Sequence, residues 1–553
     1  MKKKLILLLL LLSCFMTLQG CGKTQEEPKT HAEKDDRDEK NNEDESNSSK
    51  KDKDDSSHEN KDAKNKLLSL LGKADLSPLP IICFESENVT WYDDDSTTLL
   101  CEANYQSIYI EDTDYSALSE ALTSYSSDIN DEILAMAEEN VDYCSTDPDF
   151  RNLINEYSYL SFDSSYMHTR FDHKVLSLWH TYSDYLLGPH GSYSFDGITF
   201  DVATGERILL ADLIKDNYSD FENFAKEYLL SELLIWAGED YLAEDELAST
   251  LDSCELETYI PWYLNGSGLV FIINPYTIGP YAMGSTEVCI PYSQLFPYIK
   301  EEYLPNDGAY IGQIFANVDS RYGGFPTASD SEDLSDEVAA TKAFRIDTDI
   351  NGEYEGGVLL STATSEEVLT DYGYFQSAYF VRKSDGKDYL LTCIDQMSGD
   401  YDTTLYQLEN GSINKITSLP GNQLTSGTVF ENSFMCTKYF NVLGTYDANI
   451  TYSWNDDNSM TLQDDVFHFN TYTGDWRTMT TLLPLPVTIN GEETSLPIGT
   501  VIQITGYDGG STAFFKIVGS NETGEIHFEK DDYIHLIDGV SEYDYFDFPP
   551  YAG

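Results

Sequence analysis

The stretch FDVATGER at residues 200–207 and the helical pattern that follows it decide the fold class. The turn residues Ala-Thr-Gly at 203–205, between Phe-Asp-Val and Glu-Arg, predict a β-hairpin. Residues 221–237 then place apolar side chains at helical spacing, which predicts an amphipathic helix. Its apolar stripe consists of Phe221, Phe224, Ala225, Tyr228, Leu229 and Leu233. Strands next to such a helix are typical of an α+β fold.

The same mixture of patterns extends on both sides of this stretch. A helix is expected at residues 115–140, where apolar residues again recur at helical spacing. Strands are expected at residues 81–85, 99–110, 174–187, 269–273 and 286–290. We therefore predict one α+β domain at residues 67–303.

Helical patterns nearly vanish beyond residue 310. Short β-rich segments separated by Asp-Gly, Asn-Gly and Ser-Gly turns take their place, which predicts a β-rich domain at residues 304–483. A Pro-Leu-Pro boundary at residues 484–486 precedes three alternating segments that predict strands, at residues 499–504, 514–518 and 524–528. These segments resemble a small SH3-like barrel, which we assign to residues 484–553.

Residues 1–21 are typical of a bacterial export signal. A basic start precedes the apolar run at residues 5–12, which is shorter than the roughly 20 apolar residues that cross a bilayer. The sequence LQGC at residues 18–21 resembles the lipobox of lipoproteins, in which the Cys is acylated and becomes the mature N-terminus. Cys21 is therefore the expected lipidation site, on the extracytoplasmic face of the cell membrane. The alternative is a plain secretory signal that is cleaved nearby.

The charge of the chain lies in its folded part. Residues 22–66 are almost entirely Lys, Asp, Glu, Asn and Ser, and they predict a disordered, extended linker. Of the net charge of −64, the signal contributes +3, the linker −4 and residues 67–553 therefore −63. Such an excess repels a phosphate backbone, which argues against nucleic acid as a partner, and it suits the capture of cationic partners.

Cysteine usage leaves the disulfides open. If Cys14 is removed with the signal and Cys21 is acylated, seven cysteines remain, so they cannot all pair. Cys83 and Cys101 flank a predicted hairpin turn at residues 93–95, and this pair is the best candidate for a disulfide. The alternative is that the cysteines are free and buried. No C-x-x-C motif occurs, which argues against a redox motif or a zinc knuckle.

Five motifs in order resemble the extracytoplasmic domain of the RsiV-like and PdaC-like families. They are SLW at residues 177–179 with Tyr182, GPHG at residues 188–191, FDVATGE at residues 200–206, LLADLI at residues 209–214, and LVFIINPY at residues 269–276 followed by GPYAMG at residues 279–284. The resemblance implies an extracytoplasmic module that binds a protein or a glycan, because RsiV-like domains recognise lysozyme, a strongly cationic protein. It covers less than half of the chain.

Two departures from these families narrow the expected role. Only residues 1–4 precede the apolar run, where the RsiV-like proteins place a cytoplasmic segment that binds a sigma factor, so an anti-sigma role is not expected. The T-F-D-D-G type of metal motif that begins the PdaC-like deacetylase site is missing from the sequence, so deacetylation is not expected either. The turn at residues 188–191 and the segment at residues 276–284 are the predicted binding surface, with His190, Tyr276 and Tyr281 as its binding residues.

Two groups of residues suggest metal ligands. The sequence DTDINGE at residues 347–353 resembles the start of a calcium loop, with Asp347, Asp349, Asn351 and Glu353 as ligands. Residue 358 is Val, where an EF-hand has a bidentate Glu, so we expect a calcium loop between two strands; the alternative is a solvated acidic turn. A zinc site is conceivable for the group His168, Asp172, His173, His180 and His190, but the spacing matches no zinc motif, and ordinary hydrogen bonding is the favoured interpretation.

The sequence therefore predicts a surface lipoprotein without catalytic activity that binds an envelope or extracellular partner, either a cationic protein such as lysozyme or cell-wall glycan. The alternative is a hydrolase that modifies cell-wall glycan through an unrecognised site. Acidic pairs are too abundant to single out a glycosidase acid and base, and no G-x-S-x-G motif occurs.

Overall fold

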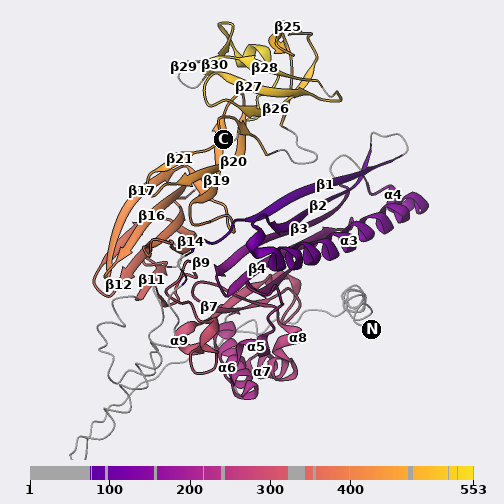
Figure 1. Cartoon of the computed structure of the whole chain (residues 1–553). Coiled ribbons are helices and arrows are strands. Elements are labelled where there is room, and N and C mark those ends of the chain that lie inside the picture. Colours follow the sequence, from indigo (N-terminus) through magenta and orange to yellow (C-terminus); the bar gives the residue numbers. More distant parts are fainter. Residues whose placement is uncertain are drawn as a thin grey trace, which may run out of the picture. The chain divides into compact units, whose positions relative to one another are not determined.

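The computed structural model describes residues 75–551, except residues 76, 94–97, 155–157, 216, 238–242, 322–342, 353–355, 398, 471–476, 521 and 532–533. The predicted signal at residues 1–21 with Cys21, the predicted linker at residues 22–66 and the predicted ligand Glu353 lie outside the described residues. The described chain is a mixture of α and β structure followed by a large β-rich C-terminal region, which confirms the predicted fold class at this level (Figure 1).

The largest sheet has ten strands and joins distant parts of the chain. Its strands follow the order β1-β2-β3-β9-β14-β15-β16-β17, with β4 paired to β3 and β5 paired to β4. The strands are β1 (Ile82–Tyr92), β2 (Leu99–Ile110), β3 (Leu160–Asp172), β4 (Val175–Tyr185), β5 (Ser192–Asp201), β9 (Tyr310–Gln313), β14 (Tyr374–Arg382), β15 (Asp388–Asp395), β16 (Tyr401–Glu409) and β17 (Ser412–Pro420). Strand β9 pairs with β3 on one side and with β14 on the other. The sheet is therefore continuous across residues 303–304, where the sequence suggested a domain boundary.

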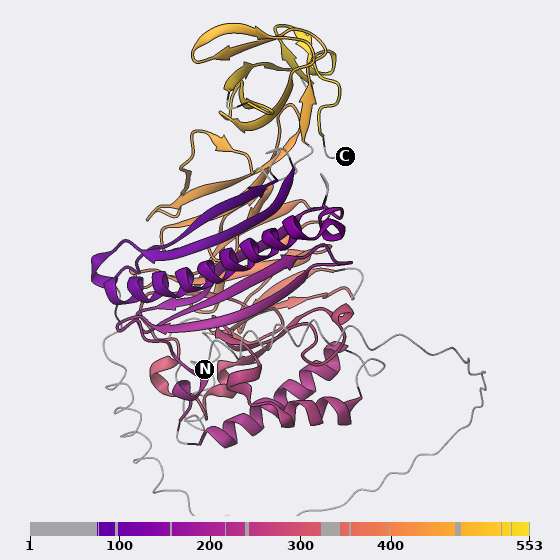
Figure 2. The same cartoon turned by 90° about the vertical axis from the view of Figure 1, so that its right-hand side faces the viewer.

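Helix α3 (Ser116–Thr146) connects the parallel strands β2 and β3 and lies along the sheet (Figure 2). A tight turn reverses the direction of the chain, so it can join only antiparallel strands. A parallel pair needs a longer crossover connection such as this helix. One face of the helix is buried, and the buried residues are Leu118, Leu122, Ser126, Asn130, Ile133, Ala137 and Cys144. These positions recur about every four residues, as the helical period requires. The helix predicted at residues 115–140 is confirmed and extends further.

A second core lies between helices and a smaller sheet. Helix α6 (Tyr218–Ala237) buries Phe221, Ala225, Leu229 and Leu233 against it, which confirms much of the predicted stripe. The sheet consists of β6 (Trp262–Leu264), β7 (Gly268–Ile273) and β8 (Thr286–Pro291). The remaining short elements of the α+β part are η2 (Thr113–Tyr115), α4 (Pro148–Arg151), α5 (Leu210–Leu213), α7 (Glu244–Ser253), α8 (Leu256–Tyr259), η3 (Tyr281–Met283), α9 (Tyr292–Leu295) and η4 (Glu301–Tyr303).

The β-rich region adds four further sheets. The first has β10 (Ser320–Arg321), β11 (Ala343–Thr348), β12 (Val358–Thr362) and β13 (Glu366–Thr370), and the second has β18 (Asn422–Leu424), β19 (Ser433–Asn441), β20 (Thr445–Trp454) and β21 (Met460–Leu462). The third has β22 (Phe467–His468), β23 (Thr478–Thr480), β24 (Leu485–Ile489), β25 (Glu492–Leu496), β26 (Val501–Tyr507), β27 (Thr512–Ile517) and β28 (Thr523–His527). The last has β29 (Glu529–Asp531), β30 (Ile534–Ile537) and β31 (Val540–Ser541), followed by α11 (Glu542–Tyr545).

The predicted C-terminal strands are present as β26, β27 and β28, which pair in antiparallel order. Their seven-stranded sheet runs from β22 to β25, with β23 also paired to β26, and among the described residues its ends do not pair with each other. A closed barrel is therefore not detected in the described part of the chain, and the SH3-like barrel is not confirmed.

The predicted pairing of Cys83 with Cys101 is wrong, because both thiols are free. The predicted hairpin exists, but its register places Cys83 opposite Tyr109 and Cys101 opposite Trp91. Cys83 and Trp91 are eight positions apart on β1, which is roughly 27 Å at the rise of a strand and far beyond the reach of a disulfide. The other five cysteines of the described residues are free as well, and they are buried.

Candidate functional site

The predicted turn at residues 188–191 connects strands β4 and β5, whose register pairs Asp184 with Ser192. Leu187 adopts a positive φ of 60°, and Gly191 lies close to the neighbouring strand. A Cβ atom at Gly191 would come within 2.7 Å of the Asp184 carbonyl oxygen, so a side chain at this position would force the turn open. The turn thereby presents the exposed ring of His190 at the end of the hairpin.

The loop between β7 and β8 is fastened to this hairpin by hydrogen bonds. The Asn274 side chain accepts from the Phe195 amide and donates to the Phe195 carbonyl, each at 2.8 Å. The Tyr281 hydroxyl donates to the Gly191 carbonyl at 2.9 Å, and His190 Nδ1 donates to the same carbonyl at 2.8 Å. The loop and the turn therefore form one surface, in which one backbone carbonyl accepts from both side chains.

Four aromatic rings meet on this surface, and we call His190, Tyr193, Tyr276 and Tyr281 the aromatic patch. The His190 and Tyr281 rings stack with centroids 4.2 Å apart, and Tyr276 and Tyr193 lie 5.6 and 5.7 Å from Tyr281. Tyr276 has a positive φ of 68° and is 57 % exposed. The three predicted binding residues thus come together, although two distant segments supply them.

The patch continues inward as a row of rings along one face of the sheet. Tyr193 lies 5.5 Å from Phe195, and Phe195 stacks on Trp179 at 4.8 Å. Such a row holds the exposed rings rigidly, because each ring rests on the next and few rotamers stay open. Sequence reasoning missed Tyr193. The alternation of Tyr193 and Phe195 in strand β5 was the signal that could have placed it on the face of the patch.

The groups around the patch are acceptors and neutral donors. Partial burial and the nearby phenols of Tyr193 and Tyr276 raise the pKa of Tyr281, so its hydroxyl stays protonated. Burial also raises the pKa of Asp184, whose carboxylate lies close enough to act on Tyr281. Stacked rings with hydroxyl and imidazole groups at their edges are suited to contact a partner surface by stacking and hydrogen bonding.

The calcium-like residues lie in a hairpin between β11 and β12, which confirms that strands flank the sequence. Asp349 adopts a positive φ of 55° in the turn. Arg345 Nε donates to the Asp347 carboxylate, and Asn351 Nδ2 donates to the Asp371 carbonyl. Two of the predicted ligands are therefore already engaged by protein groups. The calcium site stays a prediction, because its fourth ligand lies outside the described residues.

The histidines considered for zinc have separate environments. His168 is fully buried, and burial lowers its pKa to about 4. His180 stacks on Tyr166, and His173 Nε2 donates to the Ser77 carbonyl at 2.9 Å. Asp172 is paired with Arg170. Among the residues that the structure describes, no group of three His, Cys, Asp or Glu side chains could hold a metal ion.

Glu287 on β8 is a carboxyl group whose pKa is raised strongly. Burial raises its pKa to about 7, and the Tyr263 hydroxyl donates to its Oε1 at 3.0 Å. A carboxyl group that is protonated near neutral pH has the property of a general acid. Sequence reasoning did not single it out, since its burial follows from the packing of three separate strands.

A family model described as DUF3298, a protein of unknown function, matches residues 211–293, so the chain contains a DUF3298 domain. This domain includes Tyr276, Tyr281 and Glu287, whereas His190 precedes it. Two solved structures of DUF3298 family proteins are similar to the chain. The one from Bacteroides fragilis has 18% identity and a TM-score of 0.33, and the match covers 41% of this chain and 96% of that chain. The one from Pseudomonas aeruginosa has 14% identity and a TM-score of 0.31, and the match covers 42% of this chain and 100% of that chain. No curated protein matches the chain.

Within the described residues, no helix is long and apolar enough to cross a membrane.

Proposed function

We propose that the chain is an RsiV-like and PdaC-like surface lipoprotein without catalytic activity, acylated at Cys21 and held on the extracytoplasmic face of the membrane. It binds an envelope or extracellular partner through the aromatic patch. The observation that supports this proposal most is the stacking of His190 on Tyr281 at 4.2 Å, because it joins two distant segments into one exposed surface. In the same proposal residues 484–553 remain an SH3-like module.

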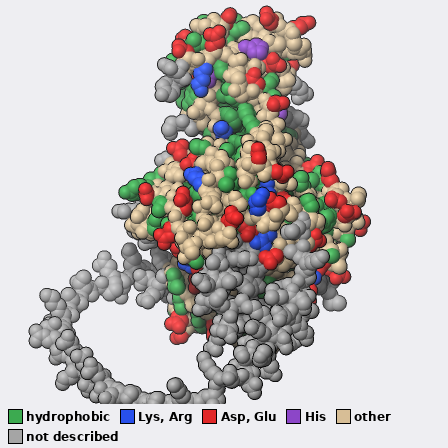
Figure 3. All heavy atoms as spheres, turned by 60° about the vertical axis from the view of Figure 1, so that its left-hand side comes forward, with side chains coloured by type: hydrophobic (Ala, Val, Ile, Leu, Met, Phe, Trp, Pro, Cys, Tyr) green, Lys and Arg blue, Asp and Glu red, His purple; other side chains and the backbone are tan. Residues whose placement is uncertain are grey.

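A cationic protein such as lysozyme is the partner that the charge favours. Residues 67–553 carry a net charge of −63, and acidic side chains are spread over the face drawn in Figure 3. Opposite charge speeds encounter, while aromatic anchors supply most of the affinity once the two surfaces touch. Cell-wall glycan is the second partner, because sugar rings also stack on exposed aromatic rings.

Binding of lysozyme to the purified protein by titration calorimetry tests the proposal. Tyr276→Ala should weaken binding about fivefold to thirtyfold, since a truncated aromatic anchor loses about 1–2 kcal/mol. Tyr259→Ala is the matched control, because Tyr259 is 62 % exposed and lies outside the aromatic patch. Equal affinity of both variants and the unchanged protein would refute the role of the patch. If soluble peptidoglycan fragments bind through Tyr276 while lysozyme does not, glycan is the partner.

The hydrolase alternative is favoured by one observation, the raised pKa of Glu287. Turnover of peptidoglycan fragments that Glu287→Gln and His190→Ala both abolish would overturn the non-catalytic proposal. The anchoring is tested separately, by following the native protein and Cys21→Ala through detergent phase separation. The native protein should enter the detergent phase and the variant should stay in the aqueous phase.

A further inference from the structure

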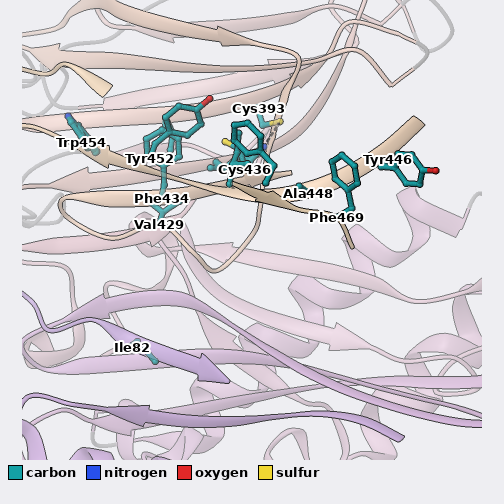
Figure 4. Packing of buried hydrophobic residues seen from close by; sticks show 14 of the residues in the cluster. Ile82, Cys393, Val429, Phe434, Cys436, Tyr446, Ala448, Tyr452, Trp454 and Phe469 are labelled. Atoms are coloured by element: carbon teal, nitrogen blue, oxygen red, sulfur yellow. Dashed lines mark hydrogen bonds between the residues drawn. The ribbon is translucent and has the colours of Figure 1, made fainter. Parts of the chain in front are cut away.

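A cavity of about 450 Å³ lies between the large sheet and the sheet of β18–β21, and we call it the inter-sheet cavity. Strands β1 to β4 form one wall, to which Phe84, Ser165 and Trp179 contribute. Residues 425–435 and strand β20 form the other wall, to which Phe434, Met435 and Thr451 contribute. Figure 4 shows Phe434 on the upper strands and Ile82, another residue of the first wall, on β1 below. Its volume lies in the range of about 300–1,000 Å³ that is typical of small-molecule sites.

The walls of the inter-sheet cavity carry no Asp, Glu, Lys, Arg or His among the described residues that line it. This is unusual in a chain of which 24% is charged and whose net charge is −64. An ionic ligand would lose its hydration in this cavity without gaining a counter-ion. An anion would also be repelled by the surrounding acidic surface. The occupant is therefore uncharged.

The lining combines two kinds of group that suit a polyhydroxylated ring. Aromatic and thioether side chains offer apolar faces, among them Phe84, Trp179 and Phe430. Hydroxyl and amide side chains lie between them, among them Ser165, Thr181, Ser433 and Asn449. An alkyl chain would bury these polar groups without partners, which is unfavourable, whereas sugar hydroxyls can bond to them.

Trp179 contributes a fixed aromatic ring to the cavity wall. Its indole Nε1 is buried and has no hydrogen-bond partner among the described residues. Its ring stacks on Phe195, so its position is fixed. A ligand in the cavity can therefore stack on the exposed part of this ring.

The opposite wall is held in place independently of any ligand. The Gly427 amide donates to the Tyr379 hydroxyl at 2.7 Å. A Cβ atom at Gly427 would come within 2.1 Å of the Met167 Cβ, so the loop lies directly on strand β3. The Thr428 hydroxyl donates to the Thr425 carbonyl at 2.7 Å and closes the loop on itself. The cavity is thus formed in advance, which reduces the entropy lost on binding.

We propose that the inter-sheet cavity binds an uncharged oligosaccharide, which stacks on its aromatic wall and hydrogen-bonds to its hydroxyl and amide groups. The proposal does not rest on the function of the aromatic patch, because none of the four patch residues lines the cavity; only the row of rings through Phe195 reaches the cavity residue Trp179. Its walls also lie outside the DUF3298 match at residues 211–293. A sugar site would therefore depend on how the large sheet and the sheet of β18–β21 pack together in this chain.

Titration calorimetry of the purified protein with neutral oligosaccharides tests the site, with tetrasaccharides of glucose, mannose and N-acetylglucosamine as probes. At least one should bind saturably. Ser165→Trp should lower its affinity at least tenfold, because an exposed serine of the cavity wall is replaced by a side chain that fills the space. Ser495→Trp is the matched control, since Ser495 is an exposed strand serine that does not line the cavity. Trp179→Phe keeps an aromatic face in the cavity wall, so it should lower the affinity less than Ser165→Trp does.

Three results would overturn the proposal. They are the failure of every probe to bind, sugar binding that Ser165→Trp leaves unchanged, and saturable binding of the neutral lipid 1-dodecanol that Ser165→Trp abolishes, which would make the cavity a lipid site. Lysozyme binding measured on the same variants distinguishes the role of the inter-sheet cavity from that of the aromatic patch. Loss of lysozyme binding in Tyr276→Ala alone and loss of sugar binding in Ser165→Trp alone would support both proposals independently.

Discussion

Strands β3 and β11 each carry an arginine two residues before an aspartate, yet the two pairs have opposite surroundings. The side chains of Arg170 and Asp172 are 1% and 2% exposed, whereas those of Arg345 and Asp347 are 38% and 32% exposed. A buried ion pair depends on every partner being present, whereas an exposed pair is screened by water and salt. The same local sequence therefore contributes differently to stability in the two strands, because long-range packing buries one pair and leaves the other exposed.

Arg170 is fully satisfied inside the protein. Its Nε donates to Asp172 at 2.8 Å, and its Nη1 donates to the Tyr292 hydroxyl at 2.7 Å and to the Tyr303 carbonyl at 2.6 Å. The guanidinium also lies 5.6 Å from the ring centroids of Tyr292 and Tyr310. Asp172 in turn accepts from the amides of the turn that begins β4. Arg170 therefore ties β3 to the segments that precede and include β9.

Replacement of Arg170 should have the largest effect. Arg170→Met leaves the Asp172 charge buried without its partner, and we expect the free energy of unfolding to fall by about 3–5 kcal/mol. Urea unfolding followed by circular dichroism measures this change.

The double variant Arg170→Met with Asp172→Asn is the control. Asparagine keeps an oxygen for the amides of the turn but carries no charge, so part of the lost stability should return. A double variant as unstable as the sum of the two single variants would show that the ion pair is not the reason for the loss.

Glu287 is an intermediate case between the buried ion pair on β3 and the exposed ion pair on β11. Its carboxyl group is largely buried, and its hydrogen-bond partner is neutral. Its pKa in the folded protein is about 7, above its ordinary value of 4.5. The folded state therefore holds this proton more tightly, and the stability that it contributes is complete below pH 4.5 and is lost as the pH rises through 7. Glu287→Gln stays neutral at every pH, so we expect it to gain about 1–3 kcal/mol relative to the unchanged protein between pH 5 and pH 8.

Thermal unfolding at pH 5 and at pH 8 checks this prediction. Glu366→Gln is the control, because Glu366 is an exposed carboxyl group on β13 and should show no comparable difference. A Glu287→Gln variant whose stability changes with pH as much as that of the unchanged protein would contradict the raised pKa.

Local patterns in the sequence predicted the elements that local contacts build. The stripes of α3 and α6 follow the helical period, and the hairpin at residues 188–191 follows from its turn residues. The motifs of the resemblance located His190, Tyr276 and Tyr281, which the structure joins in one patch.

Non-local pairing accounts for what the sequence did not predict. Strand β9 has only four residues, Tyr310–Gln313, too few for a periodic pattern, although it joins two halves of the large sheet. The inter-sheet cavity brings Trp179 and residues near 430 to opposite walls of one space. These segments lie far apart in the sequence, so no local pattern could predict that they line one cavity. The error at Cys83 and Cys101 has a related cause. Two residues that flank a turn come together only if they are equally far from it. The register of β1 and β2 shows that these two cysteines are not.

The exposed pair on β11 should matter least for stability. Arg345 contacts Asp347 and Asp319, but water reaches all three side chains, so Arg345→Met should change the free energy of unfolding by less than about 1 kcal/mol. The small change should shrink further in 0.5 M salt, because salt screens exposed charges. A loss as large as that of Arg170→Met would show that exposure does not separate the two pairs.

Arg345→Met also tests whether the turn that follows β11 binds calcium. Arg345 occupies the Asp347 carboxylate, so a calcium ion bound by Asp347, Asp349 and Asn351 would have to compete with the guanidinium. If the loop binds calcium, millimolar calcium should raise the melting temperature of the native protein, Arg345→Met should enlarge the rise, and Asp349→Ala should abolish it. Equal melting temperatures with and without calcium in all three proteins would mean that the acidic turn is only solvated, and that its arginine serves to neutralise it.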